Sequence, residues 1–264
     1  MPRLTQINIY PIKSCRGISL ERAVVERRGL RFDRRWMIVD AHYKFLTQRK
    51  HPELALVNVE IEAGQLIVSV PSKTSLSLPI RNSAGENVNV TVWDDTVPAV
   101  AVGPESDQWF SELLGFACHL VHMQDGPVRP VKREYANDGD SVSFADAFPY
   151  LLISEASLND LNQRLKTPVP MNRFRPNFVI SECGAYEEDT WKTIRIGSVG
   201  FRVAKPCDRC VTIAVDQQTG AKGTEPLETL SKYRNRDGGV FFGQNLIGDG
   251  LGSVSVGEEV VVEQ

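Results

Sequence analysis

Lys205-Pro-Cys-Asp-Arg-Cys-Val-Thr-Ile-Ala-Val-Asp216 combines two cysteines, a cation and a β-rich run in one short stretch. Cys207 and Cys210 stand three residues apart, and Arg209 lies between them. The thiolate is the form of cysteine that ligates metals and attacks electrophiles, and a neighbouring guanidinium favours it. We therefore expect thiol chemistry here, followed by a strand over residues 211–215 and a turn over residues 217–220.

Three ordinary interpretations of this CxxC pair compete. A structural zinc site needs further ligands, and the other cysteines (Cys15, Cys118 and Cys183) are scattered singly, which disfavours zinc. A thioredoxin-like dithiol stands where a strand gives way to a helix, and the strand expected after Cys210 disfavours that interpretation too. A structural disulfide or a pair of plain buried thiols stays open.

The composition is that of an ordinary globular protein. The 264 residues are 42% hydrophobic and 24% charged, which allows one large domain or two modest ones. The net charge of −3 gives no overall basic field for nucleic acid, and no apolar run approaches a membrane span. The first residues lack the apolar core of a signal peptide, and five cysteines show no framework spacing. We expect a cytoplasmic protein.

Alternating apolar residues predict strands through the first hundred residues. Ile7 and Ile9 alternate with Gln6 and Asn8, as in a half-buried strand. Similar patterns, separated by Gly and Pro, predict strands over 5–10, 18–25, 36–39, 56–61, 65–70 and 87–92.

Helices are expected only later in the chain. Ser106 is a candidate N-cap for a helix over 107–114 that ends at Gly115, and Ser154 is one for a second helix ended by Pro168 and Pro170. A short third helix is expected to open near Pro226. Residues 123–142 show little periodicity and predict a long surface loop. Further strands are expected over 178–180, 194–196, 201–203 and 254–262, the last broken by Gly257-Glu258.

These patterns indicate an α+β fold that is mostly β. We expect a strand-rich unit over residues 1–100 packed on a larger mixed unit over residues 101–264. Neither GxGxxG after the first strand nor GxxxxGK[ST] occurs, so Rossmann and P-loop nucleotide binding are not supported.

Basic residues recur in loops and at strand edges of both halves. Each alone is compatible with a solvated surface cation or an ion-pair partner. Arginine suits bidentate phosphate recognition, and lysine acts as a point charge. Together with the thiols, these residues predict an anionic ligand held between the two units: Lys13 beside Ser14, Arg31, Arg34, Arg35, Arg173, Arg175 and Arg209.

Eight motifs, in order along nearly the whole chain, resemble those of MOSC-domain proteins, in the branch of the mitochondrial amidoxime reducing component and its bacterial relatives. They are Tyr10-Pro-Ile-Lys-Ser-Cys-Arg-Gly17, Phe32-Asp-Arg-Arg-Trp36, Thr47-Gln-Arg49, Ile153-Ser-Glu-Ala-Ser-Leu158, Phe174-Arg-Pro-Asn177, Glu188-Asp-Thr-Trp191, Cys207-Asp-Arg-Cys210 and Phe242-Gly-Gln-Asn245. The resemblance implies a MOSC N-terminal β-barrel-like domain over residues 1–100 and a β-barrel MOSC domain with a few helices over residues 101–264.

The resemblance also implies a cofactor, molybdenum carried on a molybdopterin dithiolene. Cys210 matches the family's metal ligand, whereas Cys207 matches a cysteine that does not ligate. Molybdenum is thiophilic, which agrees with this assignment. The other implied cofactor-binding residues are Lys13, Ser14 and Arg34, Asp146 and Ala147, Arg175 and Asn177, Asp208 and Arg209, and Asn245. The family often has Ser or Thr where this chain has Ala147, so only a backbone contact is expected there.

The family's reaction is the two-electron reduction of N-hydroxylated compounds (amidoximes, hydroxylamines and N-hydroxylated bases) to amines or amidines. The cysteines show no C-x4-C-x2-C pattern, so we expect no intrinsic iron–sulfur cluster and a separate electron-transfer protein of the ferredoxin, flavodoxin or cytochrome type. An alternative from another class stays open: a carrier of sulfur or of the molybdenum cofactor, with Cys210 as the carrying thiol. The four histidines match no family motif.

Overall fold

Strands make up most of the regular structure. The computed structural model describes residues 1–80, 85–126 and 128–263. In these residues the helices are α1 (Pro104–Leu114), α2 (Glu155–Arg164) and α3 (Leu227–Tyr233), with short 3-10 helices η1 (Pro52–Leu56), η2 (Met171–Arg173), η3 (Glu187–Thr190) and η4 (Val211–Ala214). The expected α+β, mostly β class is confirmed. No helix in the described ranges is long and apolar enough to cross a membrane.

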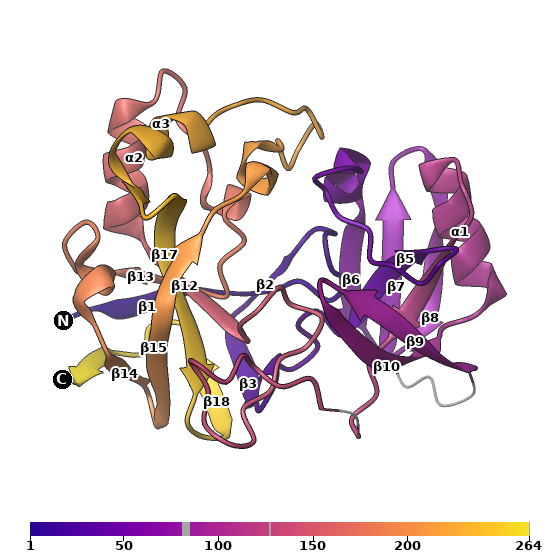
Figure 1. Ribbon diagram of the computed structural model, residues 1–264, viewed down its shortest axis with the longest axis horizontal. Coiled ribbons are helices and arrows are strands. Elements are labelled where there is room, and N and C mark those ends of the chain that lie inside the picture. Colours follow the sequence, from indigo (N-terminus) through magenta and orange to yellow (C-terminus); the bar gives the residue numbers. More distant parts are fainter. Residues whose placement is uncertain (81–84, 127, 264) are drawn as a thin grey trace.

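The largest sheet forms one lobe, on the left in Figure 1. Its main order is β19 (Val260–Glu263), β14 (Thr193–Ile196), β15 (Val199–Asp208), β17 (Gly239–Gly248), β12 (Tyr150–Ser154), β13 (Phe178–Ser181), β1 (Arg3–Ile9) and β2 (Ile18–Leu20), and β16 (Asn235–Arg236) pairs with β17. The pairing between β12 and β13 is parallel. Side chains such as Leu4, Phe178 and Phe201 form the apolar core of this lobe.

Two smaller sheets form the second lobe, on the right in Figure 1. One has the order β5 (Trp36–Asp40), β11 (Cys118–His122), β10 (Asp95–Ala101) and β9 (Asn87–Val92), and the other is β6 (Asn58–Glu62), β7 (Gln65–Val70) and β8 (Lys73–Pro79). Helix α1 covers this lobe with buried Trp109 and Phe110. A third small sheet joins β18 (Gly252–Ser255), β3 (Arg22–Glu26) and β4 (Gly29–Leu30).

The chain crosses between the lobes. Strand β1 pairs with β13 in the large sheet, and β11 pairs with β5 in the other lobe. The residues at both ends of the chain therefore share a sheet, and the boundary near residue 100 stays a prediction.

Most predicted elements are confirmed, and β7 and β9 match their predicted ranges. Ser154 caps α2, since its side chain accepts a hydrogen bond from the backbone N–H of Ser157. Gly115 ends α1 in the left-handed conformation. The break at Gly257-Glu258 separates β18 from β19.

The strand expected over residues 211–215 is wrong, because the 3-10 helix η4 occupies residues 211–214 and Val215 forms only an isolated bridge with Lys222. The pairing of β15 with β17 ends at Asp208, so the β-branched residues beyond it have no partner strand. Strand propensity depends on such a partner, and the chain instead closes a turn in which the Ile213 N–H donates to the Cys210 carbonyl. A 3-10 helix therefore follows Cys210, and the expected strand that disfavoured a thioredoxin-like dithiol is not formed.

Three further predictions need correction. The N-cap of α1 is Gly103, with Pro104 at the first position, and the Ser106 hydroxyl donates to the Gly103 carbonyl instead. The strand predicted over 18–25 is two strands, β2 and β3, that enter different sheets. The segment 123–142 has no helix or strand in its described residues, but it is not all surface, since Arg129 and Val131 are buried.

Candidate functional site

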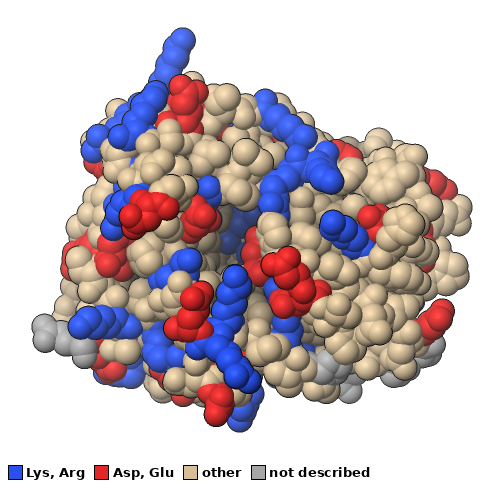
Figure 2. Space-filling view, in the orientation of Figure 1, with Lys and Arg blue, Asp and Glu red and all other residues tan. Residues whose placement is uncertain are grey.

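A cavity of about 270 Å³ lies where the two lobes meet, and every predicted site residue lines it. These residues are Lys13, Ser14, Arg34, Asp146, Ala147, Arg175, Asn177, Asp208, Arg209, Cys210 and Asn245. They come from the turn after β1, the segment before β5, the loop before β12, the turn before β13, the end of β15 and the middle of β17. Figure 2 shows a hollow between the lobes with basic and acidic side chains around it.

The cavity is strongly basic although the whole chain carries a net charge of −3. Seven Lys and Arg side chains line it, against two Asp side chains. A concentration of one sign of charge in a cleft attracts ligands of the opposite sign. The cavity therefore suits an anionic ligand.

Lys13 is a buried cation at one end of this cavity. Its Nζ lies 2.5 Å from Asp146 Oδ1 and donates to the Phe144 carbonyl at 2.7 Å. Burial lowers the pKa of Lys13, and Asp146 acts in the opposite direction. Desolvation acts to raise the pKa of Asp146, although its side chain is partly exposed, but Lys13, Trp93 and Arg49 together hold that pKa below its ordinary value.

Arg34 is held in place by a buried carboxylate and a buried amide. Its Nη1 donates to Asp33 Oδ2 at 2.7 Å and to Asn177 Oδ1 at 3.2 Å. Asn177 is 2% exposed, and its amide also contacts the backbones of Leu151 and Asn8. The side chain of Asn177 is thus engaged within the protein and orients Arg34.

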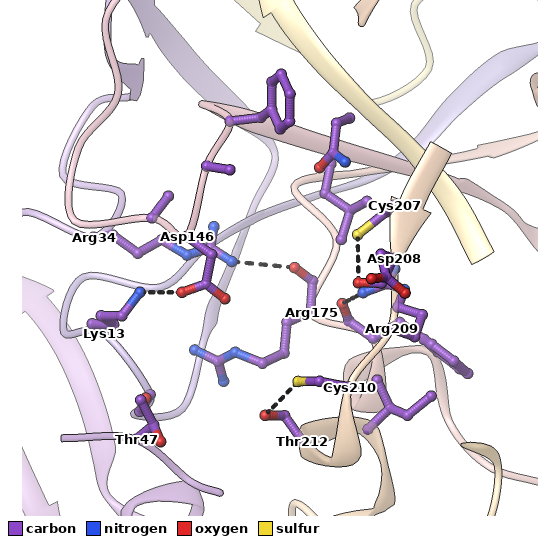
Figure 3. A pocket seen from close by; sticks show the side chains of 18 of the residues that line it. Lys13, Arg34, Thr47, Asp146, Arg175, Cys207, Asp208, Arg209, Cys210 and Thr212 are labelled. Carbon is purple, nitrogen blue, oxygen red and sulfur yellow. Dashed lines mark hydrogen bonds and ion pairs between the residues drawn. The ribbon is translucent and has the colours of Figure 1, made fainter. Parts of the chain in front are cut away.

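Arg175 is a cation of the cavity without a polar side-chain partner in the described residues. In the described residues its guanidinium forms no hydrogen bond or ion pair, and it lies 4.1 Å from the ring centroid of Tyr10. Burial lowers its pKa to about 10, so it stays charged at neutral pH. Figure 3 shows its side chain extended across the pocket, with the Lys13–Asp146 pair on one side and Cys210 on the other.

Three of the predicted site residues have an uncommon backbone conformation. The φ angles of Ser14, Arg34 and Arg175 are 71°, 48° and 55°. Such a left-handed conformation costs about 1–3 kcal/mol in a residue other than glycine and is concentrated at functional sites. The fold therefore maintains local strain where the basic residues enter the cavity.

The two cysteines of the CxxC pair lie at the other end of the cavity. Cys210 is exposed, follows the end of β15, and its Sγ lies 3.2 Å from Thr212 Oγ1. Cys207 is less accessible, and burial raises the pKa of its thiol. All five cysteines are free thiols, so the disulfide interpretation is excluded in this structure.

Arg209 braces this end of the cavity. Its Nε donates to the Phe242 carbonyl at 2.8 Å, and its Nη1 donates to the Phe174 carbonyl at 3.1 Å. Its Nη2 is buried without a partner in the described residues. A buried donor left unsatisfied is costly, which points to a ligand that accepts from it.

Comparison with known proteins identifies the family. Family models for the MOSC N-terminal beta barrel domain and the MOSC domain match residues 1–117 and 139–261. Mouse mitochondrial amidoxime-reducing component 1 is 36% identical over 276 residues, 97% of this chain and 81% of that protein. This chain belongs to the MOSC-domain proteins.

Two further relatives differ in the activities that their names give. Bovine mitochondrial amidoxime reducing component 2 is 34% identical over 275 residues, 97% of this chain and 82% of that protein. Rice molybdenum cofactor sulfurase is 35% identical over 262 residues, 91% of this chain but 32% of that protein. The two matched segments agree with the order of the two MOSC regions expected from the motifs, whereas β1 and β2 of the first segment lie in the large sheet.

Not every basic residue singled out in the sequence faces the MOSC cavity. Arg31 is exposed and pairs with Glu26, whereas buried Arg35 donates to the Met123 carbonyl and to Asp125. Arg173 does line the cavity, and it pairs with Asp216 at 2.7 Å. The expectation of an anion contact is therefore wrong for Arg31 and Arg35.

Several cavity residues were missed from the sequence. Thr47, Gln48 and Arg49 line the cavity, as do Lys205 and Thr212. The first three form one of the motifs that resemble the family, and this motif was the available signal. None of the four histidines is among the cavity-lining residues that the structure describes.

Proposed function

We propose that this MOSC protein binds a molybdenum–molybdopterin cofactor and reduces N-hydroxylated compounds (amidoximes, hydroxylamines and N-hydroxylated bases) to amines or amidines. The observation that carries this proposal is an exposed thiol, Cys210, in a cavity with seven Lys and Arg side chains. The similarity to the amidoxime-reducing components supports the choice of substrate class.

The residues present fit such a cofactor. A molybdenum–molybdopterin group has an anionic phosphate, a polar ring system and a thiophilic metal. Lys13 and Arg175 are suited to the phosphate, because the first is a buried ammonium and the second is an unpaired guanidinium. Cys210 is the donor suited to the metal, and Arg209 Nη2 and Asn245 offer further hydrogen bonds.

In this proposal the side chain of Asn177 acts indirectly. Its amide is engaged by Arg34 and by two backbone groups, so we assign it to orienting Arg34 rather than to the pterin. In the described part of the chain no cluster of three or more His, Cys, Asp or Glu side chains could hold a metal ion. We therefore assign the remaining metal donors to the dithiolene of the cofactor.

When bound, the cofactor supplies two-electron redox chemistry. The net change is one N–O bond broken, with two electrons and two protons consumed and one water released. The chain contributes the positive field that holds the anionic group and the fixed position of the Cys210 thiol. The electrons come from a separate ferredoxin-, flavodoxin- or cytochrome-type protein that docks near the mouth of the cavity. The cytoplasmic location stays a prediction, since the related amidoxime-reducing components are named mitochondrial.

The decisive experiment compares Cys210→Ala with Cys207→Ala, after expression under conditions that load molybdenum. We expect the wild type and Cys207→Ala to contain molybdenum and pterin near stoichiometry and to reduce a hydroxylamine with a chemical reductant. Cys210→Ala is expected to lose the metal and at least about a hundredfold in turnover. Wild-type protein free of metal and pterin contradicts the proposal.

A second candidate is a carrier of sulfur or of the molybdenum cofactor, with Cys210 as the carrying thiol. The similarity to a molybdenum cofactor sulfurase and the exposure of Cys210 favour it. The two functions separate in one assay. A loaded protein that never turns over a hydroxylamine, but releases thiocyanate from Cys210 when treated with cyanide, is a sulfur carrier.

A further inference from the structure

Arg129 is a buried cation outside the cavity lining. It is 5% exposed and lies in the segment between β11 and β12. Its Nη1 donates to the carbonyls of Ser143 and Ala145 at 3.0 and 2.5 Å, and its Nη2 donates to the Asp146 carbonyl at 3.0 Å. Its Nε donates to Asp95 Oδ2 at 2.8 Å, and Asp95 lies on strand β10 in the lobe that contains α1.

These bonds determine which groups of the loop before β12 remain free. The Phe144 carbonyl is taken by Lys13, so four consecutive carbonyls, from residue 143 to residue 146, are bound to two cations. A free carbonyl beside a bound anion repels it, whereas a carbonyl bound to a guanidinium is electrostatically compensated. Because these oxygens are bound to cations, their repulsion of an anion at this wall of the cavity is compensated.

The backbone N–H groups of the same loop differ from these carbonyls in their hydrogen bonding. Within the described residues, the backbone N–H groups of Asp146, Ala147 and Phe148 donate no hydrogen bond, although all three residues line the cavity. Successive N–H groups in a turn conformation form a concave anion site, and residues 144–147 form a bend. The same cavity holds the unpaired guanidinium of Arg175, which independently indicates an anion.

We propose that Arg129 is a positioning residue of this site. It holds the segment 143–148 so that the amides of Asp146, Ala147 and Phe148 face an oxyanion, the phosphate group of the cofactor. The inference rests on the proposed cofactor site and adds to it a residue that never touches the ligand.

The requirement is for arginine rather than for a positive charge. Four of the five N–H donors of Arg129 are used, and they spread over three carbonyls and one carboxylate. A lysine ammonium is a single point with three donors, so it cannot reproduce this fork. Arg129→Lys therefore keeps the charge and releases the loop.

The test uses the cofactor-free protein and inorganic phosphate. Calorimetric titration and the rise in melting temperature with added phosphate both report anion binding without any redox chemistry. We expect Arg129→Lys to weaken phosphate binding at least tenfold and to lose the phosphate-induced rise. The matched control is Arg35→Lys. Arg35 is buried to a similar extent and donates to the carbonyl of Met123, the first residue after β11. This variant is expected to melt at a lower temperature and to keep the phosphate response.

A merely structural role for Arg129 predicts a lower melting temperature with unchanged phosphate affinity, and that result overturns the inference. A wild type that binds no phosphate overturns it as well. If Arg129→Lys does not fold, Asp95→Asn loosens the same arginine from its half-exposed partner and is expected to weaken phosphate binding about threefold. Unchanged affinity in Asp95→Asn then overturns the inference. Phosphate binding that depends on Arg129 in a protein without reductase activity supports the inference and counts against the reductase function alone.

Discussion

At the residue scale, buried charges behind the cavity fix the groups that line it. Asp33 is fully buried and accepts hydrogen bonds from the Tyr10 backbone and from Arg34. The sequence marks Asp33 only as part of a motif, and the structure shows that its carboxylate connects the turn after β1 to a cavity arginine. Removing one member of such a pair leaves the other charge buried and uncompensated, which is strongly destabilising.

His122 is a titratable group that the proposed mechanism does not use. Its ring lies 4.7 Å from that of Trp36, and its buried Nδ1 has no hydrogen-bond partner in the described residues. Burial, together with the charges of Arg35 and Arg28, lowers its pKa to about 4 from 6.5, against a smaller opposite effect of Asp125.

This pKa predicts a loss of stability in mild acid. In the unfolded chain His122 binds a proton below its ordinary pKa of 6.5, whereas the folded protein excludes that proton down to a pKa of about 4. The contribution of neutral His122 to the free energy of unfolding is complete above pH 6.5. As the pH falls toward 4, the free energy of unfolding decreases by up to about 3 kcal/mol. Urea unfolding at several pH values measures it. His122→Phe is expected to flatten this part of the profile, and His42→Phe, at an exposed histidine, is not. Parallel profiles for the wild type and His122→Phe contradict the prediction.

At the element scale, β17 carries cavity and structural residues side by side. Its Gln244 is buried and donates to Asp189 at 2.6 Å, while the next residue, Asn245, lines the cavity. This division follows from the alternation of side chains along a strand. Gly243 precedes them with a φ of 78°, a conformation that favours glycine.

Gly243→Ala is expected to destabilise the protein by more than about 2 kcal/mol, because the left-handed backbone alone costs about 1–2 kcal/mol. The added methyl group would also lie 2.6 Å from Ile153 and 2.7 Å from the Leu152 carbonyl. Gly250→Ala is the control, since a methyl group there meets nothing within 4 Å. Denaturant unfolding compares the two, and equal midpoints for both variants would show that the close approach at Gly243 is unimportant.

At the scale of the whole molecule, buried hydrogen bonds join the two lobes at one side of the cavity. Gln48 and Gln217 exchange amide hydrogen bonds at 3.2 and 3.0 Å, and Gln48 also donates to the Ser14 carbonyl. Gln217 in turn donates to the Val215 carbonyl, just beyond η4. Figure 1 shows the segment after η4 reaching from the left lobe to the right lobe. This buried pair connects the Ser14 turn to the Cys210 turn.

Gln48→Leu and Gln217→Leu are each expected to cost about 1–3 kcal/mol, because each leaves the partner amide buried without its bonds. The double variant is expected to cost less than the sum, with a coupling of about 0.5–3 kcal/mol measured by a double-mutant cycle in denaturant. Gln108→Leu, which removes an exposed amide paired with Glu112, is expected to change stability by less than about 0.5 kcal/mol. Strict additivity of Gln48→Leu and Gln217→Leu would show that the lobes do not depend on this contact.

Local signals in the sequence determined the elements with regular patterns. Alternation fixed β7 and β9, and the Ser154 side chain fixed the start of α2. Strands without alternation escaped prediction: β12 is buried at every position, and β17 is interrupted by glycine. Further strands (β8, β10 and β11) were missed as well, and β10 contains Pro98.

The candidate site, like the fold, was predictable from the sequence only in part. Its lining was predictable because the motifs that resemble the family place Lys13, Arg175 and Cys210 at recognisable positions, and the structure brings them to one cavity. Arg129, the Gln48–Gln217 pair and the turn at η4 were not predictable. Their roles depend on partners distant in the chain or on where a neighbouring strand ends. Side-chain type and spacing are local properties of the sequence, whereas the satisfaction of buried hydrogen bonds is decided only when the chain has folded.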